Sequence, residues 1–296
     1  MEKAEVYLVP TIDTDPRFYN NYVKGDKKII DDDLTYEKWA IKKAIKIATQ
    51  VMKGKAVFMI HTSPFFRSKF YRGPFIKLWE EILAIGGELA LHPQEDKVGD
   101  GTYYYDKRHM ERVINEITIK IRNLNLPLNI FRSGYYAWSP YIAPILGKLN
   151  YKIDISCAPG IVDPNRDVNW INAPRYAYYY NEQNKNQNNC KTSFFVIPLG
   201  WDGKGHQFEE NYLFCEKGSL NSLCRVWDTL VEEEISSFPK IVNFLYHTFA
   251  LDDESVCSRI ARFIEYVRKH NGVILTASEA KELYDRRTTK LCKGSY

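Results

Sequence analysis

The feature that most constrains the fold is a regular alternation of short apolar runs with longer amphipathic segments along the chain. Runs of period two or of continuous apolar residues are typical of strands, and apolar residues at helical spacing are typical of helices. Repeated strand–helix alternation predicts a parallel sheet covered by helices, either closed as a barrel or open and doubly wound. We expect strands near residues 5–13, 55–63, 87–96, 128–134, 151–158, 193–200, 240–249 and 272–278. We expect helices near residues 36–52, 74–86, 107–125, 139–150, 218–235 and 252–270.

The chain is predicted to form one α/β domain over residues 1–296. Its 296 residues and hydrophobic content of 45% are enough for one large core. Neither a linker nor a shift in composition divides the alternating pattern. One segment, residues 172–191, is rich in Tyr and Asn and interrupts the pattern, so we expect it to be a surface insertion or hairpin.

The composition excludes several classes of function. Lys and Arg total 41 against 37 Asp and Glu, a net charge of +4, and there is no long basic run, so we expect no nucleic-acid partner. No apolar run is long enough to span a membrane, and the N-terminal segment reaches polar residues too soon for a secretory signal. The six cysteines include no Cys-x-x-Cys pair, which favours free thiols in a reducing compartment. We therefore expect a cytoplasmic protein with no membrane partner.

The first apolar run ends in Asp13-Thr14-Asp15-Pro16. Asp and Pro are common in turns, and on that reading the segment is the solvated start of a loop. Residues two apart point to the same side of a strand, so the other reading brings both carboxylates into one small volume. Like charges that close are costly unless a cation or a proton compensates. The pair is therefore a candidate part of a metal site.

Polar residues also follow most of the other expected strands. Functional sites of parallel α/β folds lie at the carboxyl ends of the strands. Four of the six histidines fall at or just past such ends, whereas His109 and His270 fall on expected helices, where we expect a solvated role. A shared edge would gather acids, imidazoles and a guanidinium, which a hydrolytic metal site needs. In chain order the strand-end residues are Asp13, Asp15, His61, His92, Glu95, Asp96, Arg132, Asp154, Ser156, Trp201, Asp202, His206 and His247.

A divalent metal ion is the cofactor that these residues favour. Asp15, His92 and Asp96 offer a mixed set of oxygen and nitrogen ligands, which suits zinc. His92 and Asp96 lie four residues apart, so a helical turn after the strand would bring them to one face. Glu95 is the alternative third ligand. Each of these residues could instead be an ordinary turn residue, and His61 could be structural or a substrate contact.

The order of these motifs resembles the polysaccharide deacetylase family, which carries the NodB-homology domain and is also called carbohydrate esterase family four. The family's first motif resembles Thr-Phe-Asp-Asp-Gly-Pro, and its second has a metal histidine followed by another four residues on. The third has an Arg beside aromatic or Gly residues, the fourth has Asp and Trp, and the fifth is a strand that ends in His. The corresponding segments here lie within about residues 5–280 and read TIDTDP, LHPQED, FRSGYYAWSP, GWDG and FLYHTF.

The resemblance implies an incomplete (β/α) barrel of seven or eight mostly parallel strands, a divalent metal that is often zinc, and removal of an N-acetyl group from a sugar or glycan. It implies that Asp13 is the general base, that Arg132 orients Asp13 and that His247 is the general acid. Asp15 and His92 would be metal ligands. We expect four residues to bind the substrate or to shape its site: His61, Tyr135, Trp201 and Asp202.

The departures from the family pattern keep two other functions open. Thr14 separates two aspartates that are adjacent in the family, and an acid at position 95 or 96 replaces the second metal histidine. The alternatives are another amide hydrolase on the same scaffold and a non-catalytic carbohydrate-binding relative with a decayed metal site. A carboxylate should hold up the pKa of His247, and Asp154 is the candidate. Four aromatic residues would either stack on sugar rings or pack in the core: Tyr135, Tyr136, Trp138 and Trp201.

Overall fold

The computed structural model describes residues 5–25, 34–99, 101–180, 194–233 and 238–293, with side chains up to residue 288. Its strands are β1 (Val6–Asp13), β2 (Val57–His61), β3 (Glu88–His92), β4 (Ile130–Phe131), β5 (Ile153–Asp154), β6 (Val162–Asp163), β7 (Val168–Asn169), β8 (Tyr178–Tyr179), β9 (Phe195–Val196), β10 (Lys240–His247) and β11 (Gly272–Ile274). Its helices are α1 (Tyr19–Val23), α2 (Thr35–Met52), α3 (Arg67–Phe70), α4 (Gly73–Ala84), α5 (Lys107–Arg122), α6 (Ile142–Lys148), α7 (Phe208–Asn211), α8 (Leu220–Glu232), α9 (Glu254–Lys269) and α10 (Ala277–Lys293).

The main sheet is an incomplete barrel. Its strands follow the order β10-β1-β2-β3-β4-β5-β9-β8, and β11 pairs with β1 as well. All of these pairs are parallel except β8 with β9, so eight of the nine strands run parallel. After β9 the chain reaches back to β10 through the bridge between Leu199 and Asn243, which nearly closes the sheet on itself. The predicted fold class is confirmed.

Alternating side chains divide most buried apolar residues of the sheet between an outer and an inner core. In β1, Val6 and Leu8 pack outward against the helices, whereas Tyr7 and Val9 point into the barrel. The inner core continues around the sheet with apolar residues from the other strands, among them Val57, Met59, Ala90, Ile130, Ile153 and Ile241. The same alternation continues for two to four more residues along the strands. It brings polar side chains to the inner face of the sheet at the carboxyl ends of the strands.

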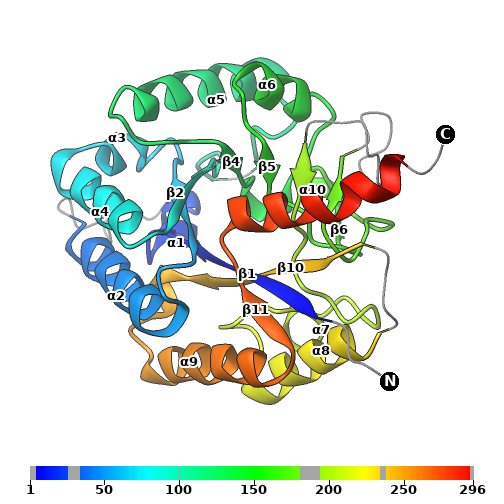
Figure 1. Ribbon diagram of the computed structural model, residues 1–296. Coiled ribbons are helices and arrows are strands. Elements are labelled where there is room, and N and C mark those ends of the chain that lie inside the picture. Colours follow the sequence, from blue (N-terminus) through cyan, green and yellow to red (C-terminus); the bar gives the residue numbers. More distant parts are fainter. Residues whose placement is uncertain (1–4, 26–33, 100, 181–193, 234–237, 294–296) are drawn as a thin grey trace.

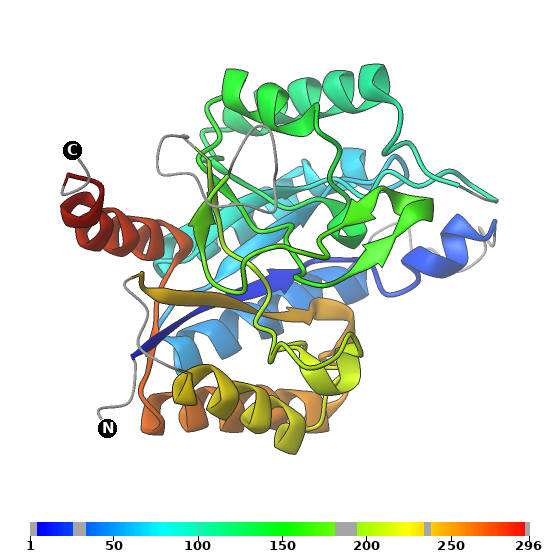
Figure 2. The ribbon, with the colours of Figure 1, turned by 90° about the vertical axis from the view of Figure 1, so that its right-hand side faces the viewer.

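Helices surround the sheet and cover its outer face. Figure 1 shows α5 and α6 along one side, α2 and α4 on the next, and α8 and α9 on the side opposite α5. Figure 2 shows α10 at the end of the barrel where the strands begin, far from α1 at the other end. None of the described helices is both long and apolar enough to cross a membrane.

Helix α10 closes the end of the barrel opposite the polar residues, and the sequence analysis did not predict it. Its residues Ala277, Ala280 and Tyr284 belong to the inner core. The helix begins with a capping box, in which Thr276 and Glu279 exchange hydrogen bonds between side chain and backbone N–H. Glu88 at the start of β3 also accepts hydrogen bonds from the first N–H groups of α10, so the helix is fixed to the sheet.

Other boundaries differ from the prediction mainly in length. Strands β4, β5 and β9 have only two residues each in regular pairing, although longer runs were expected. Part of the expected insertion at 172–191 forms β8, which pairs antiparallel with β9 and so makes one arm of a hairpin. The rest of that segment, from residue 181, lies outside the described residues.

Candidate active site

The chain leaving β1 is tied to the neighbouring strand by the residue between the two aspartates. The hydroxyl of Thr14 donates to the Met59 carbonyl at 2.6 Å, and the Thr14 hydroxyl oxygen accepts from the His61 N–H at 3.3 Å. Thr14 therefore points away from the barrel axis and extends the strand geometry by two residues. As a result Asp13 and Asp15 present their carboxylates on the same side.

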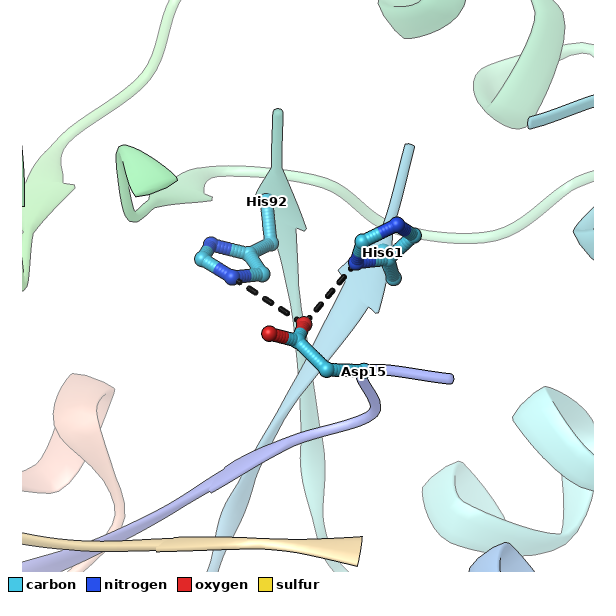
Figure 3. Close-up of side chains that lie close together, drawn as sticks. All are labelled: Asp15, His61 and His92. Atoms are coloured by element: carbon cyan, nitrogen blue, oxygen red, sulfur yellow. Dashed lines mark hydrogen bonds and ion pairs between the residues drawn. The ribbon is translucent and has the colours of Figure 1, made fainter. Parts of the chain in front are cut away.

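Asp15 meets two histidines from adjacent strands (Figure 3). Its Oδ1 lies 2.8 Å from Nδ1 of His61, the last residue of β2, and 3.4 Å from Nε2 of His92, the last residue of β3. Each residue offers one ligand atom, and all three atoms lie within 4.8 Å of one another. All three side chains are buried, so the group is an enclosed cluster rather than a set of surface charges.

Neighbouring groups orient this cluster. The Nδ1–H of His92 donates to the Arg132 carbonyl at 3.0 Å, which directs its Nε2 toward Asp15. Gln94 donates to the other oxygen of Asp15 at 3.1 Å. Such outer hydrogen bonds fix the tautomer and the orientation of metal-binding side chains.

The electrostatics of the cluster follow from burial and mutual attraction. Burial alone would raise the pKa of Asp15, but the imidazoles of His61 and His92 outweigh it and hold that pKa well below its ordinary value. Burial alone would lower the pKa of His92, but the carboxylates of Asp13 and Asp15 outweigh it and raise that pKa. The carboxylates thus create a strongly negative environment that attracts protons or a cation.

The residues of the cluster fit a divalent metal ion. Two imidazoles and one carboxylate are a common set of three protein ligands in catalytic zinc sites, which keep a further position for water or substrate. His92 Nε2 is buried and has no hydrogen-bond partner among the described groups. Once the ring has lost its proton, an imidazole nitrogen of this kind is a suitable metal ligand.

Asp13 lies beside this cluster, with its Oδ2 3.7 Å from Nε2 of His92, and it contacts two further basic groups. Its Oδ2 is 3.3 Å from Nε of Arg132, which follows β4, and 3.5 Å from Nε2 of His247, the last residue of β10. Its Oδ1 is buried and has no hydrogen-bond partner among the described groups. Asp13 is therefore held by a guanidinium through one oxygen, while the other stays available to accept a proton.

His247 pairs with a carboxylate that the sequence analysis did not identify. Its Nδ1 contacts Glu216, and both side chains are largely buried. Burial lowers the pKa of His247, but Glu216 together with Asp13 and Asp15 outweighs burial and raises it to about 9. Glu216, and not the expected Asp154, is the carboxylate at this ring. Asp154 instead accepts hydrogen bonds from the backbone N–H and the hydroxyl of Ser156.

The cluster opens into a cavity of about 650 Å³. Asp13, Asp15 and His92 lie at its base. Cationic side chains, Arg17, Arg166 and Lys217, stand around it. On the side of His247 an apolar wall is formed by Ile161, Phe208, Phe214 and Leu245. This cavity can hold a polar reacting group at its base and apolar or sugar-like groups against its wall.

The loop after β4 places two tyrosines at the cavity in an unusual backbone conformation. Tyr135 and Tyr136 both line the cavity, and both are left-handed, with φ of 52° and 63°. For residues with a side chain this conformation costs on the order of 1–3 kcal/mol each. At Gly134 before them a Cβ would meet Gln94 Oε1 at 2.1 Å and the Tyr104 hydroxyl at 2.2 Å, so a larger residue there would force these buried side chains to shift. Strain of this kind is concentrated at functional sites.

The two acids predicted as the third metal ligand, Asp96 and Glu95, lie apart from the cluster of Asp15, His61 and His92. Asp96 accepts a hydrogen bond from the Tyr19 hydroxyl at 2.8 Å. Glu95 is fully buried and forms two hydrogen bonds with Arg67, at 2.7 and 2.9 Å, and one with His109 at 2.7 Å. The third member of the group is instead His61, which we expected to be structural or a substrate contact. His109, expected to be solvated, is part of the Glu95 network.

The remaining predicted residues lie away from the base of the cavity. Asp202 is buried and accepts hydrogen bonds from Asn211 and Arg225 at 3.0 and 3.2 Å. Trp201 donates to the Gly205 carbonyl and stacks on His206. Neither Trp201 nor Asp202 is among the described residues that line the cavity. Trp138 is buried in the outer core, so of the four aromatic candidates only Tyr135 and Tyr136 reach the cavity.

Comparisons with known proteins identify the fold. No protein-family model matches the sequence, and no curated protein matches it significantly. Among solved structures, proteins assigned as polysaccharide deacetylases from Mycobacterium smegmatis and Pseudomonas aeruginosa PAO1 superpose with TM-scores of 0.65 and 0.61. They are 10% and 12% identical to this chain, and each match covers 97% of this chain and 92% of the other. The chain has the polysaccharide deacetylase fold.

The resemblance inferred from the five motifs is thus confirmed at the level of the fold. The same fold search also finds the 4-alpha-glucanotransferase from Thermococcus litoralis, with a TM-score of 0.53, 11% identity and coverage of 93% of this chain and 40% of the other. A deacetylase and a glucanotransferase catalyse different reactions, so the fold alone does not determine the chemistry. The chemistry therefore depends on the side chains at the carboxyl ends of the strands.

Proposed function

We propose that this protein is a metal-dependent hydrolase that removes the N-acetyl group from an N-acetylated sugar or glycan. The observation that carries the proposal is the meeting of two buried groups at the end of the barrel. One group is Asp15, His61 and His92, and the other is Asp13 held between Arg132 and His247. Amide hydrolysis needs a Lewis acid, a base for water and an acid for the leaving amine, and these two groups supply residues for each role.

In this proposal Asp15, His61 and His92 hold the divalent ion, and zinc is the ion that best fits a carboxylate with two imidazoles. When bound, the ion supplies Lewis-acid polarisation of the acetyl carbonyl and lowers the pKa of a water. Gln94 and the backbone carbonyl of Arg132 hold Asp15 and His92 in place by the hydrogen bonds described above. The carboxylate of Asp96 is not needed for this set.

Asp13 is the proposed general base. Its Oδ1 is free of other hydrogen bonds among the described groups, so it can accept a proton from the attacking water. Arg132 contacts only Oδ2 of Asp13 and keeps the carboxylate oriented. Positioning of this kind can contribute a large part of the rate, because the reacting atoms are held near their transition-state arrangement.

His247 is the proposed general acid. The acidic groups around it raise its pKa to about 9, so the ring carries its proton at neutral pH. Its Nε2 lies 3.5 Å from Asp13, which places the acid and the base on the same reacting group. As the tetrahedral intermediate collapses, the proton on Nε2 passes to the nitrogen of the leaving amine. Glu216 on Nδ1 fixes the ring and stabilises its charged form.

A sugar substrate is proposed from the fold and from the cavity. The solved structures with TM-scores above 0.6 are assigned as polysaccharide deacetylases. The cavity of about 650 Å³ is open enough for a ring with substituents, and Tyr135 and Tyr136 line it. We keep the predicted cytoplasmic location as a prediction, which fractionation of cells that make the native protein would test.

The test is acetate release from N-acetylglucosamine and its oligomers by protein purified without chelators. We expect release by the untreated protein, loss after removal of divalent ions and recovery when zinc is added. A matched Asp13→Asn variant should keep its metal and lose activity. Full activity in chelator-treated, metal-free protein would contradict metal dependence, and no acetate release from any N-acetylated sugar by metal-loaded protein would contradict the deacetylase assignment.

A further inference from the structure

The loop after β4 carries a buried hydroxyl whose proton has no acceptor. The hydroxyl of Tyr136 has no hydrogen-bond partner among the described groups, although the residue lines the cavity. The Arg132 guanidinium lies 5.2 Å from the ring centroid and interacts with the phenolic oxygen. A guanidinium only donates hydrogen bonds, so Arg132 cannot accept the phenolic proton. Buried polar groups without partners are rare in folded proteins, and one that lines a cavity indicates a ligand contact.

Two unpartnered acceptors line the same cavity. Asp13 Oδ1 and Glu216 Oε2 are both buried and lack hydrogen-bond partners among the described groups. The residues that line the cavity therefore carry one hydroxyl donor and two carboxylate oxygens that are buried and without partners among the described groups. A secondary amide attacked by water complements this set, because its carbonyl oxygen accepts and its N–H and the water donate.

The position of the Tyr136 hydroxyl is fixed before any ligand binds. Its backbone is left-handed, with φ of 63°, and its ring stacks on Phe208 with the centroids 5.8 Å apart. Burial, with smaller contributions from Asp13 and Glu216, outweighs the opposing charge of Arg132 and raises the pKa of Tyr136, so its hydroxyl stays a neutral donor. A donor that is held in place needs little reorganisation during the reaction, which is the condition for strong stabilisation of developing charge.

We propose that the Tyr136 hydroxyl donates a hydrogen bond to the carbonyl oxygen of the scissile amide, and that this bond strengthens as the oxygen gains negative charge. The proposal rests on the function proposed above and assigns a residue to the oxygen, which Asp13 and His247 do not serve. The bond exists in the bound substrate and is stronger in the tetrahedral intermediate. Its loss should therefore lower kcat more than it raises KM.

The chain offers a matched control in Tyr246. Its hydroxyl is also buried and without a partner among the described groups, but its side chain packs in the outer core and not at the cavity. Tyr136→Phe and Tyr246→Phe therefore remove the same kind of unpartnered hydroxyl from two places. Because neither change breaks a hydrogen bond, both variants should melt at or slightly above the wild-type temperature.

For turnover of an N-acetylated sugar, we expect Tyr136→Phe to lower kcat by at least about tenfold. This is a smaller loss than the roughly 10²–10³-fold seen when a principal oxyanion donor is removed. KM should change by less than about twofold. Tyr246→Phe should match the wild type in both constants. Wild-type kcat in Tyr136→Phe would overturn the assignment, and so would an equal loss in the two variants.

A binding measurement tests the hydroxyl without turnover. The probe is the N-methylphosphonyl analogue of glucosamine, whose tetrahedral P–O⁻ group stands for the charged oxygen. We expect Tyr136→Phe to weaken its Kd by at least about fivefold, with Tyr246→Phe unchanged. If no variant hydrolyses an N-acetylated sugar but Tyr136→Phe alone loses affinity, the proposed deacetylase function fails and the donor assignment stands. Equal Kd values in wild type and Tyr136→Phe, or no binding by any of the three proteins, would overturn the donor assignment.

Discussion

Replacing Glu216 by Gln should move the alkaline limb of the pH–rate profile. Glu216 is the largest of the influences that raise the pKa of His247 from 6.5 to about 9. Gln keeps the size of the side chain and a carbonyl oxygen that can accept from Nδ1–H, but it removes the charge. In the variant, Asp13 and Asp15 still raise the pKa of His247, whereas burial of the ring lowers it.

The size of the effect follows from the pKa. A rise from 6.5 to about 9 corresponds to roughly 3 kcal/mol in favour of the protonated ring. Without the charge of Glu216, the pKa of His247 should fall back toward its ordinary value of 6.5. The general acid must be protonated, so activity is retained below the pKa and lost as the pH rises through it. At pH 8 most rings of the variant would then be neutral, which predicts a loss of kcat on the order of tenfold or more, with little loss at pH 6.

The assay is kcat for acetate release from pH 5.5 to 10 for wild type, Glu216→Gln and a control, Glu209→Gln, whose side chain is exposed on α7. A bound divalent cation lowers the pKa of His247 in all three proteins, so the difference between the limbs is the quantity compared. The control should follow the wild-type profile. Superimposable profiles for wild type and Glu216→Gln would refute the reasoning, and a loss that is equal at every pH would show that Glu216 only positions the ring.

Three further predictions concern the same end of the barrel. Asp13→Asn should lower kcat by about 10²–10⁴-fold and leave the metal content unchanged, measured by acetate release and elemental analysis; equal metal loss in Asp13→Asn and Asp15→Asn would show that the two carboxylates share ligation. Because the pKa of His92 is raised and a metal needs the neutral ring, zinc affinity should fall by up to about tenfold per pH unit as the pH drops. A zinc Kd that is the same at pH 6 and pH 8 would contradict this. Glu95→Ala should lower the free energy of unfolding in urea by about 3 kcal/mol, near the lower end for broken buried ion pairs because Arg67 keeps 20% of its side chain exposed. An unchanged unfolding midpoint would show that the Glu95 network does not stabilise the fold.

The strand-end residues could be predicted because the alternation of strand side chains is readable in the sequence. In β10 the residues Ile241, Asn243, Leu245 and His247 fall on one side of the strand, so His247 is directed inward by the same rule that buries Ile241. The same rule applied to Val57, Met59 and His61 places His61 on the inner face of β2. The spacing from His92 to Asp96 brings these two side chains together only in a helical turn, and the chain makes no helical turn there.

Glu216 could not be predicted by this reasoning. It follows no strand, but lies in the connection between α7 and α8, where a single bridge between Phe214 and Leu245 brings it to β10. This contact joins segments about thirty residues apart, and no local pattern indicates it. The left-handed conformation of Tyr135 and Tyr136 could not be predicted for a related reason. Tyr does not favour this conformation, and only the surrounding packing imposes it.

Helix α10 was overlooked although its signal is present. The sequence from Thr276 to Glu279 has the spacing of a capping box, and it follows directly after β11. The expected strand at 272–278 extended over these residues and concealed the start of the helix. An apolar run that ends in Thr-x-x-Glu is better divided at the Thr, because the side chain of that residue stops the strand and begins the helix.

The most direct test of the account is the metal content of four proteins after equilibrium dialysis against limiting zinc: wild type, His61→Ala, His92→Ala and Asp96→Asn. If Asp15, His61 and His92 hold the ion, wild type and Asp96→Asn should each bind about one zinc per chain, and the two histidine variants should bind none while keeping a cooperative thermal transition. Zinc retained in His61→Ala and lost in Asp96→Asn would contradict the ligand set, and no zinc in the wild type would contradict the metal-dependent mechanism itself.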